Sequence, residues 1–508
     1  MFFQKYFYAI FVFITGGVIM MLEMAAFRLS TPYFGASLFV WANIIGLIMV
    51  SLAIGYYFGG KLADLHPKRK VLMLIVLSSG VLISFIPIVS RFFLPFFVAG
   101  SDNASFFSES LIASSFLFVA VLFILPLTLL GIVSPFVIRL QNQEVSTTGF
   151  ISGSIYAFST VGSIFGTFFA SFLTIPFWGI KETILFSSFC LIVIGLAGLG
   201  RDFKKSLLFF LLLPILLNFV SLSKRENLIY EKESFHGLIE VVKDEKFGYI
   251  LDINRSGRWS VYHPEKILTG IYFDYFLPLY FLLNERENLD ILIIGHAGGV
   301  TSRQYSYFFG DKNLKIEGVE LDPEVTRAAE QFFNLAEQKN LEVVNMDGRI
   351  YLQSTKNKYD LIFIDAYIGS LYVPFQLTTK EFFDLAKSRL KDEGILAMMV
   401  LSQNPQKERA FQGISQSIKS VFSNVYFFPT KSRGEFFIVS SRFPLEEKLF
   451  NLEEKTDILE IKEISADISQ NFQEARELRE DYILTDNRAP IEMLREFDKI
   501  FFLFSGLE

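Results

Sequence analysis

The sequence predicts an α-helical transmembrane bundle followed by an α/β domain with a Rossmann-like sheet, which begins with a small β unit. Hydrophobic residues make up 51% of the 508-residue chain and charged residues only 20%, which is too apolar for an entirely soluble protein. Long apolar stretches fill the first part of the chain, whereas short apolar runs alternate with helical patterns in the second. We therefore predict a multi-span transmembrane domain at 1–224, a β-strand unit at 225–285 and a Rossmann-like domain at 286–508.

Six apolar stretches are long enough to cross a hydrocarbon core of about 30 Å, which takes about 20 helical residues. These stretches lie near 6–28, 39–60, 71–98, 111–140, 149–175 and 181–200. A seventh stretch, 205–222, is shorter and contains Pro214, so the predicted number of spans is six or seven. The first stretch lacks a small-residue cleavage site and is expected to stay in the mature protein.

The segment after about Leu228 predicts a different architecture. In YEKESFHGLIEVVKDEKFGYILDINRSGRWSVYH, apolar and polar residues alternate and the pattern breaks at Lys246 to Gly248, which predicts an antiparallel hairpin unit. Downstream, apolar strands alternate with helical patterns until two final strands, NVYFFPT and GEFFIVSSR. This alternation is typical of a class I methyltransferase-like sheet with a final antiparallel hairpin.

A glycine-rich turn follows the first strand of this sheet. The strand Ile291 to Ile294 leads directly into Gly295, Gly298 and Gly299, and a helical pattern comes next. This order lets the backbone approach a cofactor at the carboxyl edge of a parallel sheet. GHAGG lacks the G-x-G-x-x-G spacing of a dinucleotide site, so adenosine with a short charged tail fits better, as in S-adenosylmethionine or a relative. A tight turn without a ligand is the alternative.

Acidic residues follow the next three strands. Glu320 ends IEGVE about 25 residues after the glycine turn, Asp347 lies in VVNMDGR, and Asp365 ends YDLIFID. Because the carboxyl ends of parallel strands share one edge, three carboxylates are expected to converge there. Glu320 has the position of an acid that accepts hydrogen bonds from both ribose hydroxyls, and a solvated strand end is the alternative.

Composition argues against other classes of site. The formal net charge of −6 gives no support for nucleic-acid binding. Cys190 is the single cysteine, which excludes a disulfide framework and a cysteine metal cluster. The four histidines do not cluster at metal-ligand spacing, so we expect no metal.

YDLIFIDAY, VELDPEV, the DGR turn and the glycine strand together resemble the spermidine synthase (polyamine aminopropyltransferase) family. They are most similar to its membrane-fused members, in which a multi-span segment related to major facilitator transporters precedes the synthase domain. The resemblance also includes EMAAFRLSTPYFGASLFVWANIIGLIMVSLAIGYYFGGKLAD, SGSIYAFSTVGSIFGTFFASFLTIP and YILTDNRAPIE, and so covers most of the chain. It implies a membrane-bound transferase of polyamine biosynthesis, which moves an aminopropyl group from decarboxylated S-adenosylmethionine to putrescine or a related amine.

The resemblance also implies roles for individual residues on the acceptor side of the site. Asp365 aligns with the acid that accepts a proton from the attacking amine or hydrogen-bonds it, a general-base and positioning role. Tyr367 would line the same pocket. His236, in the early strand unit, is the other predicted substrate-binding residue.

The resemblance implies roles for the cofactor-binding residues in the same way, by matching each position of the family motif to this sequence. Glu320 should bind the ribose, and Asp347 with Gly348 the amino edge of adenine. Gly295 with Gly298 should contact the tail of the cofactor.

Two departures from the family pattern leave the cofactor and the acceptor open. Where spermidine synthases have an aspartate in a G-G-G-D-G-G turn, this chain has Gly298, so the carboxylate that would bind the aminopropyl ammonium is missing. The glutamine that the family often has in the early strand unit is replaced by Gly237 beside His236. Both the decarboxylated cofactor and a polyamine acceptor are therefore open questions.

Three functions remain under comparison. The first is the aminopropyltransferase, and the second is an enzyme that uses ordinary S-adenosylmethionine for methyl transfer or another attack at the sulfonium. The third is a non-catalytic membrane protein, linked to transport or sensing a ligand. The expected partners are a small-molecule amine and the lipid bilayer but no nucleic acid, and a homodimer is one open alternative for the oligomeric state.

Basic residues in short loops predict the orientation of the bundle. Those that mark cytoplasmic loops are Lys61, Lys68, Arg69, Lys70, Arg201, Lys204 and Lys205, whereas 101–110 has no lysine or arginine. Six spans return the chain to the cytoplasm, and a seventh crossing would place the soluble domain outside. Because adenosylmethionine-type cofactors are cytosolic, we expect a multi-pass protein of the cell (inner) membrane with a cytoplasmic soluble domain. Either the segment 205–222 then does not cross fully, or the number of spans before it is wrong by one.

Overall fold

A computed structural model of the protein describes two compact units, Met1–Arg225 and Glu226–Glu508. The described residues are 2–34, 37–93, 111–142, 144–199, 209–220, 225–284, 286–367, 373–432, 434–475 and 483–495.

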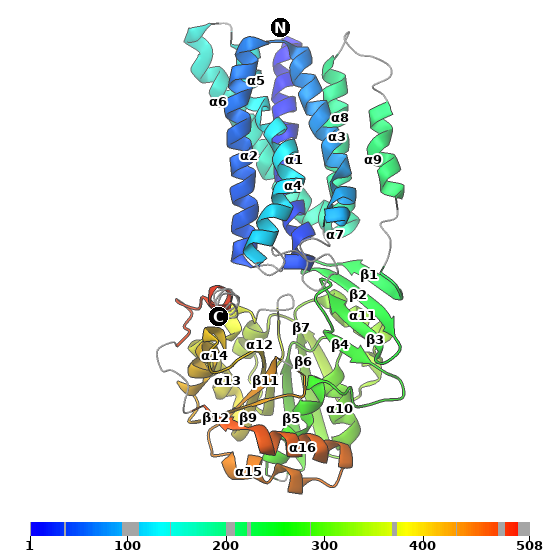
Figure 1. The fold of residues 1–508 in the computed structure, drawn as a ribbon, viewed down its shortest axis with the longest axis vertical. Coiled ribbons are helices and arrows are strands. Elements are labelled where there is room, and N and C mark those ends of the chain that lie inside the picture. Colours follow the sequence, from blue (N-terminus) through cyan, green and yellow to red (C-terminus); the bar gives the residue numbers. More distant parts are fainter. Residues whose placement is uncertain are drawn as a thin grey trace, which may run out of the picture. The chain divides into compact units, whose positions relative to one another are not determined.

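The first unit is a bundle of long apolar helices (Figure 1). Its α-helices are α1 (Phe2–Phe34), α2 (Leu38–Leu65), α3 (Arg69–Phe93), α4 (Leu111–Gly131), α5 (Val133–Gln141), α6 (Thr148–Phe169), α7 (Ile175–Trp178), α8 (Ile180–Leu199) and α9 (Phe209–Phe219). Within the described residues, six helical segments are long and apolar enough to cross a membrane: Tyr6–Phe34, Leu38–Leu65, Arg69–Phe93, Ala113–Gln141, Val145–Trp178 and Ile180–Leu199. The prediction of a bundle of apolar helices is confirmed.

Glycines let helices of this bundle lie close together. A Cβ atom on Gly162 of α6 would lie 2.0 Å from the carbonyl oxygen of Phe13, and one on Gly166 would lie 2.1 Å from that of Gly17. Both contacts are with α1, so no larger side chain fits between these two backbones. Small residues at helix contacts are the usual means of close packing in lipid.

The last helix of the bundle, α9, bears on the number of crossings. Its 11 residues extend about 16 Å, which is roughly half of a hydrocarbon core. It packs on α3 and α8, and the Lys181 ammonium at the start of α8 donates to the carbonyls of Asn218 (2.7 Å) and Val220 (3.0 Å). The chain therefore returns to the side of the bundle at which α8 begins. Arg201, Lys204, Lys205 and the loop 101–110, used for the orientation above, lie outside the described residues.

The second unit begins with an antiparallel sheet in the order β1-β2-β3-β4. Its strands are β1 (Leu228–Glu233), β2 (Leu238–Asp244), β3 (Gly248–Ile253) and β4 (Ser260–Tyr262). The break predicted at Lys246 to Gly248 is the turn between β2 and β3. A 3-10 helix, η7 (Tyr272–Leu282), leads to the next sheet.

An eight-stranded sheet follows, in the order β12-β10-β11-β9-β8-β5-β6-β7. Its strands are β5 (Asn288–Ile294), β6 (Asn313–Glu320), β7 (Leu341–Asn345), β8 (Tyr359–Ile364), β9 (Leu390–Leu401), β10 (Asn424–Pro429), β11 (Glu435–Ser441) and β12 (Gln473–Glu474). Strands β5 to β9 pair in parallel, and β10, β11 and β12 join antiparallel. The predicted methyltransferase-like sheet with a final antiparallel hairpin is confirmed, and its order reverses at β5, where such sheets bind ligands.

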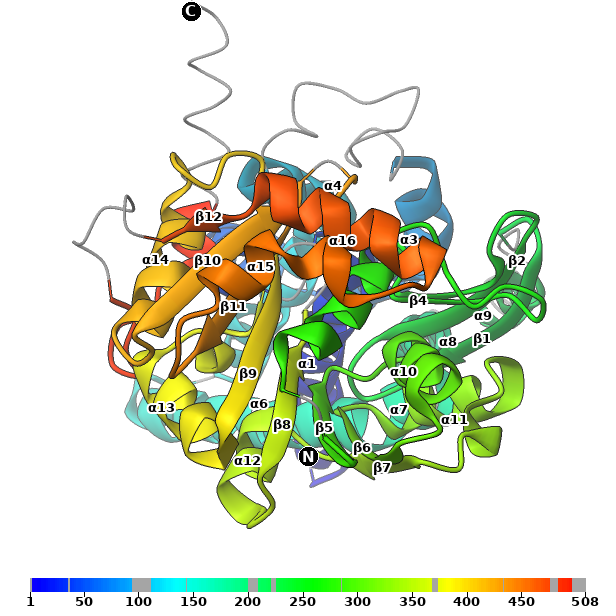
Figure 2. The same ribbon diagram turned by 90° about the horizontal axis from the view of Figure 1, so that it is seen from below.

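Helices cover both faces of this sheet (Figure 2). They are α10 (Val300–Phe309), α11 (Pro323–Phe332), α12 (Gly348–Ser354), α13 (Lys380–Arg389), α14 (Arg409–Lys419), α15 (Glu446–Phe450) and α16 (Leu459–Asn471). In β8, Leu361 and Phe363 pack toward η7, α10 and α16, whereas Ile362 and Ile364 pack toward α13 and α14. The period of two along the strand is the reason that these apolar runs form strands with two buried faces.

Candidate active site

The glycine turn after β5 crosses the end of β8. Gly295 has a φ of 86°, and a Cβ atom there would lie 2.2 Å from the carbonyl oxygen of Asp365. Gly299, with a φ of 77°, begins α10. Glycine is therefore required at 295 both by its left-handed conformation and by the close approach of the neighbouring strand.

Glu320 lies at the end of β6 and faces this turn. Its Oε2 accepts the backbone N–H of Ala297 (2.9 Å), and its Oε1 accepts that of Asp322 (3.0 Å). Burial raises the pKa of Glu320 to about 7, the charge of Asp322 adds to this, and the two backbone hydrogen bonds oppose it. A carboxylate oxygen can accept a second hydrogen bond, so both oxygens retain acceptor capacity for a ligand.

Asp347 and Gly348 lie beside Glu320 on the same sheet edge. The backbone N–H of Met346 donates to the Glu320 carbonyl (3.0 Å). Asp347 caps α12, because its Oδ1 accepts the N–H groups of Arg349 (2.9 Å) and Ile350 (3.0 Å). A Cβ atom on Gly348 would lie 2.4 Å from the Ile294 side chain, so glycine lets α12 begin against β5.

Asp365 follows β8 at the centre of this edge. Its backbone N–H donates to the Ile294 carbonyl (2.9 Å), and its carboxylate accepts the Tyr272 hydroxyl (3.0 Å). Burial raises the pKa of Asp365 to about 7, the Tyr272 hydrogen bond opposes this rise, and the negative charge of Glu435 adds to it. At neutral pH a substantial fraction of such a carboxyl is ionised and able to accept a proton.

Tyr367 is close to Asp365, but its hydroxyl is already engaged. The hydroxyl donates to the Met399 carbonyl (3.1 Å) and accepts the Leu401 N–H (3.0 Å). The side chain therefore joins the segment after β8 to the end of β9. Its ring packs against the hydrophobic cores on both faces of the sheet, and its hydroxyl has a structural partner at each side. Its predicted place in the acceptor pocket stays a prediction.

His236 lies in the turn between β1 and β2 and is exposed. Its backbone N–H donates to the Ser234 hydroxyl (3.0 Å), and that hydroxyl donates to Asp322. Because Asp322 is two residues after Glu320, this turn is anchored beside the carboxyl edge of the sheet. Within the described residues no hydrogen bond joins His236 to Asp365, and its predicted role in binding the acceptor stays a prediction.

Our interpretation of Gly298 needs correction. A Cβ atom there would lie 2.7 Å from both the Cβ and the Oγ of Ser260, and the Gly298 N–H donates to that Oγ (3.1 Å). An aspartate therefore does not fit at 298 in this conformation. When the last two glycines of G-G-G-D-G-G are aligned with Gly298 and Gly299, its aspartate corresponds to Ala297. Ala297 has a φ of 46°, and its backbone N–H donates a hydrogen bond to the Glu320 carboxylate.

The sequence interpretation missed several polar residues at this edge. Tyr272 has no motif around it, and it reaches Asp365 across 93 residues of chain. Glu435 begins β11 opposite Leu401, the last residue of β9, and Ser260 holds the glycine turn. Glu435 could have been found in the sequence only from its place as an acid at the start of the strand predicted to pair antiparallel with β9.

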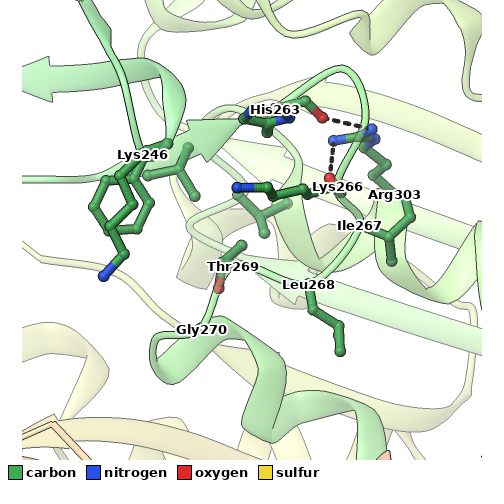
Figure 3. Close-up of a pocket in the computed structure, with 11 residues that line it drawn as sticks. Lys246, His263, Lys266, Ile267, Leu268, Thr269, Gly270 and Arg303 are labelled. Atoms are coloured by element: carbon green, nitrogen blue, oxygen red, sulfur yellow. Dashed lines mark hydrogen bonds between the residues drawn. The ribbon is translucent and has the colours of Figure 1, made fainter. Parts of the chain in front are cut away.

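A pocket of about 300 Å³ lies near the glycine turn (Figure 3). Basic residues from three segments line it: Lys246, His263, Lys266 and Arg303. The Arg303 guanidinium donates to the carbonyls of His263 (3.0 Å) and Lys266 (3.4 Å), which fixes the loop after β4. This concentration of basic side chains disfavours a cationic ligand in this pocket.

Glu320 and Asp365 predict a pH dependence of stability. In the folded protein both pKa values lie near 7, above the usual 4.5 and 3.8. The contribution of these two groups to folding stability is fully present at a pH below their pKa values in the unfolded state. It is lost as the pH rises through their folded-state pKa values near 7. Glu320→Gln removes one of the two charges. In ligand-free protein, the unfolding temperature of the variant minus that of the wild type should therefore increase from pH 5 to pH 8. A difference that is constant or decreases over this range contradicts the raised pKa.

The fold and the residues at its carboxyl edge define a class I methyltransferase-like domain with an added antiparallel sheet. Residues 279–441 match the spermine/spermidine synthase domain family, so the second unit carries a spermidine synthase-type domain, which confirms the resemblance found in the sequence.

Relatives share different parts of the chain. A probable polyamine aminopropyl transferase of Bifidobacterium longum is 30% identical over 285 residues, which cover 53% of this chain and 62% of that protein, less than two thirds of its length. Polyamine aminopropyltransferase 2 of Aquifex aeolicus is 24% identical over 474 residues, 88% of this chain and 90% of that protein, so the similarity there extends into the helical unit. A spermidine synthase crystallised with the transition state analogue AdoDATO is 20% identical, covers 43% of this chain and 74% of its own, and gives a TM-score of 0.35.

Proposed function

We propose that this protein is a membrane-bound aminopropyltransferase, which uses decarboxylated S-adenosylmethionine as donor and an amine as acceptor. The observation that carries the proposal is Asp365, a carboxyl with a pKa near 7 that accepts the Tyr272 hydroxyl at the point where the strand order reverses. Glu320 and Asp347 lie along the same edge, where they can hold a nucleoside. The synthase domain match and the named relatives support the same reaction.

The site residues have distinct tasks in this reaction. The acceptor nitrogen bonds to the aminopropyl carbon attached to sulfur, and the carbon–sulfur bond breaks with its electron pair left on sulfur. The sulfonium becomes a neutral thioether, methylthioadenosine, while the nitrogen loses a proton to the Asp365 carboxylate. Glu320 with the ribose and Asp347 with the adenine would hold the sulfonium carbon in line with the nitrogen.

Ala297 favours a second candidate, an enzyme that uses ordinary S-adenosylmethionine. The turn offers no carboxylate at this position to bind an aminopropyl ammonium, and none to repel the carboxylate of the undecarboxylated cofactor. Methyl transfer would use the same adenosine site and the same proton acceptor.

Mass spectrometry of the products distinguishes the two candidates. Full-length protein purified in detergent is incubated with putrescine and each cofactor in turn. Aminopropylated amine together with methylthioadenosine supports the proposal, whereas methylated product points to the second candidate. Cofactor binding without turnover of either cofactor would contradict an enzymatic function.

Ala297→Asp tests whether the glycine turn selects the cofactor. At an effective dielectric near 20, a charge contact at about 4 Å is worth on the order of 4 kcal/mol before desolvation and about 1 to 2 kcal/mol net. The variant should therefore shift the affinity ratio toward the decarboxylated cofactor by about tenfold. Calorimetry with both cofactors measures the ratio, and Ala297→Asn is the uncharged control. Gly298→Asp should weaken both ligands alike because its Cβ would displace Ser260.

The orientation of the synthase domain is a separate prediction. We propose that it faces the cytosol, where adenosylmethionine-type compounds are made. The chain after α9 lies on the side of the bundle where α8 begins. With seven full crossings, a cytosolic synthase domain places the amino terminus and the loop around Pro67 on the opposite side of the membrane, which conflicts with the cytoplasmic side that the basic residues of this loop predict. A reporter fused after Glu508 should be active only in the cytosol, and a reporter at Pro67 shows whether α9 crosses. Activity of the Glu508 fusion only outside contradicts the orientation.

A further inference from the structure

The pocket of Figure 3 combines an apolar lining with basic side chains. Its apolar residues come from the β2–β3 turn, β4, the loop after β4 and the first position of α10: Phe247, Val261, Ile267, Leu268 and Val300. The basic residues come from the same parts of the chain: Lys246, His263, Lys266 and Arg303. Its volume of about 300 Å³ is at the lower end of the range of small-molecule sites. The pocket thus has the size to hold a small ligand.

β4 separates this pocket from the glycine turn. The Ser260 hydroxyl oxygen accepts the Gly298 N–H (3.1 Å), whereas Val261, the next residue of β4, lines the pocket. Successive side chains of a strand point to opposite faces of the sheet, so the two contacts lie on opposite sides of β4. The pocket is therefore a site apart from the turn that faces Glu320.

The loop that forms one wall of the pocket is held at both ends. At its far end, the Asp274 carboxylate accepts the backbone N–H groups of Thr269 (2.9 Å) and Gly270 (2.7 Å) and the Thr269 hydroxyl (2.8 Å). At its near end, the Arg303 guanidinium donates to two carbonyls of the loop. Because these contacts lie within the protein, the wall is formed before any ligand binds.

The positive charge of the pocket is not balanced by carboxylates. Among the described residues, none of the four basic side chains forms a salt bridge, and no aspartate or glutamate lines the pocket. The Lys246 ammonium instead lies 5.0 Å from the centroid of the Phe247 ring, and the Arg303 guanidinium lies 4.4 Å from that of Tyr262. Aromatic faces attract these cations but leave their charge in place.

The basic side chains also keep hydrogen-bond donors for a ligand. A guanidinium has five N–H groups, and Arg303 uses two of its nitrogens on carbonyls. Partial burial lowers the pKa of Arg303, as expected for a cation that loses water without a counter-charge. The His263 Nδ1 accepts the Glu265 N–H (3.1 Å), so the neutral ring carries its proton on Nε2. The Lys266 side chain extends from its loop toward the turn that carries Lys246 (Figure 3).

We infer that this pocket binds the phosphate group of a small organic anion, with the apolar part of the ligand against Val261 and Leu268. The two lysines supply point charges, and Arg303 and His263 add directed hydrogen bonds, a combination suited to phosphate oxygens. Several positive groups exceed the single charge of a carboxylate and match a phosphate with about two negative charges. A soluble phosphate ester and a lipid head group offer the same chemistry. The inference goes beyond the proposed transfer reaction and does not depend on it.

Calorimetry on full-length protein in a non-ionic detergent tests the site, with phenyl phosphate as the probe. Phenyl phosphate should bind more tightly than inorganic phosphate, which lacks the ring, and more tightly than phenol, which lacks the charge. Lys246→Gln combined with Lys266→Gln should weaken phenyl phosphate binding by about tenfold, the scale of two solvated charge contacts. The control combines Lys339→Gln with Lys358→Gln, which removes the same charge at exposed positions outside the pocket and should leave the affinity unchanged.

Four results would overturn the inference. The first is no measurable binding of phenyl phosphate, and the second is an affinity for phenol or inorganic phosphate equal to that for phenyl phosphate. The third is an equal loss of affinity in the pocket variant and the control variant, which would reflect net charge alone. The fourth is competition between phenyl phosphate and methylthioadenosine, which would place the probe in the nucleoside site instead.

Lipid bilayers of two compositions distinguish the sources of the phosphate. The protein is reconstituted in phosphatidylcholine alone and in phosphatidylcholine with phosphatidylglycerol. Loss of phenyl phosphate binding only in the presence of phosphatidylglycerol supports an anionic lipid head group as the occupant of the site. Unchanged affinity in both bilayers supports a soluble phosphate ester. Loss of binding in both bilayers, with binding retained in detergent, overturns the inference for the membrane-embedded protein.

Discussion

Asp365→Asn should lower turnover by about 100-fold or more, the usual scale for a positioned proton acceptor, and leave cofactor affinity nearly unchanged. Asparagine has the same shape and can still accept the Tyr272 hydroxyl, so the hydrogen bond that holds the side chain is retained. The amide cannot take the proton that the attacking nitrogen must lose. Single-turnover kinetics at saturating cofactor measure the loss, and calorimetry with methylthioadenosine measures binding. A variant with normal turnover would remove Asp365 from the mechanism.

The pH profile gives this prediction a second measurement. Because the pKa of Asp365 is about 7, kcat/KM in the wild type should rise as the pH passes through that value. Tyr272→Phe removes the hydrogen bond that opposes the raised pKa, so the rise should move to higher pH. The titration of the amine substrate is common to both proteins and cancels in the comparison. A rise at the same pH in both would show that Tyr272 does not act on the proton acceptor.

The features that the sequence predicted correctly depend on local patterns. Alternation in the β unit, the apolar runs of the parallel strands and the acid after each strand are readable because strand periodicity and strand ends are short-range properties. Glu320, Asp347 and Asp365 meet at one edge because parallel strands bring their carboxyl ends together. The long apolar helices follow from length and composition alone.

The residues that were missed depend on contacts between distant segments. Tyr272 meets Asp365 only because η7 packs under the sheet, and Glu435 joins the same edge only through the antiparallel pairing of β11 with β9. The glycine turn shows the same limit on a smaller scale. Whether 297 or 298 can carry a side chain is decided by Ser260, which lies 38 residues earlier in the chain.

Glu320→Ala should weaken binding of every adenosyl ligand by a few kcal/mol, because we propose that this buried carboxylate accepts hydrogen bonds from both ribose hydroxyls. Calorimetry with S-adenosylmethionine, its decarboxylated form and methylthioadenosine measures the effect, and Glu342→Ala on the exposed face of β7 is the control. The variant also leaves the N–H groups of Ala297 and Asp322 without their acceptor, so some loss could come from a loosened turn.

A ligand without ribose hydroxyls separates these two causes. Wild-type protein should bind 2′,3′-dideoxyadenosine more weakly than adenosine, whereas Glu320→Ala should bind the two with nearly equal affinity. If the variant still prefers adenosine by the wild-type factor, the ribose hydroxyls bind elsewhere and Glu320 acts only on the turn. Unchanged affinity for all three adenosyl compounds would remove Glu320 from the site altogether. Loss of the preference would show that the acid at the end of β6 recognises the sugar, because only the hydroxyls differ between the paired ligands.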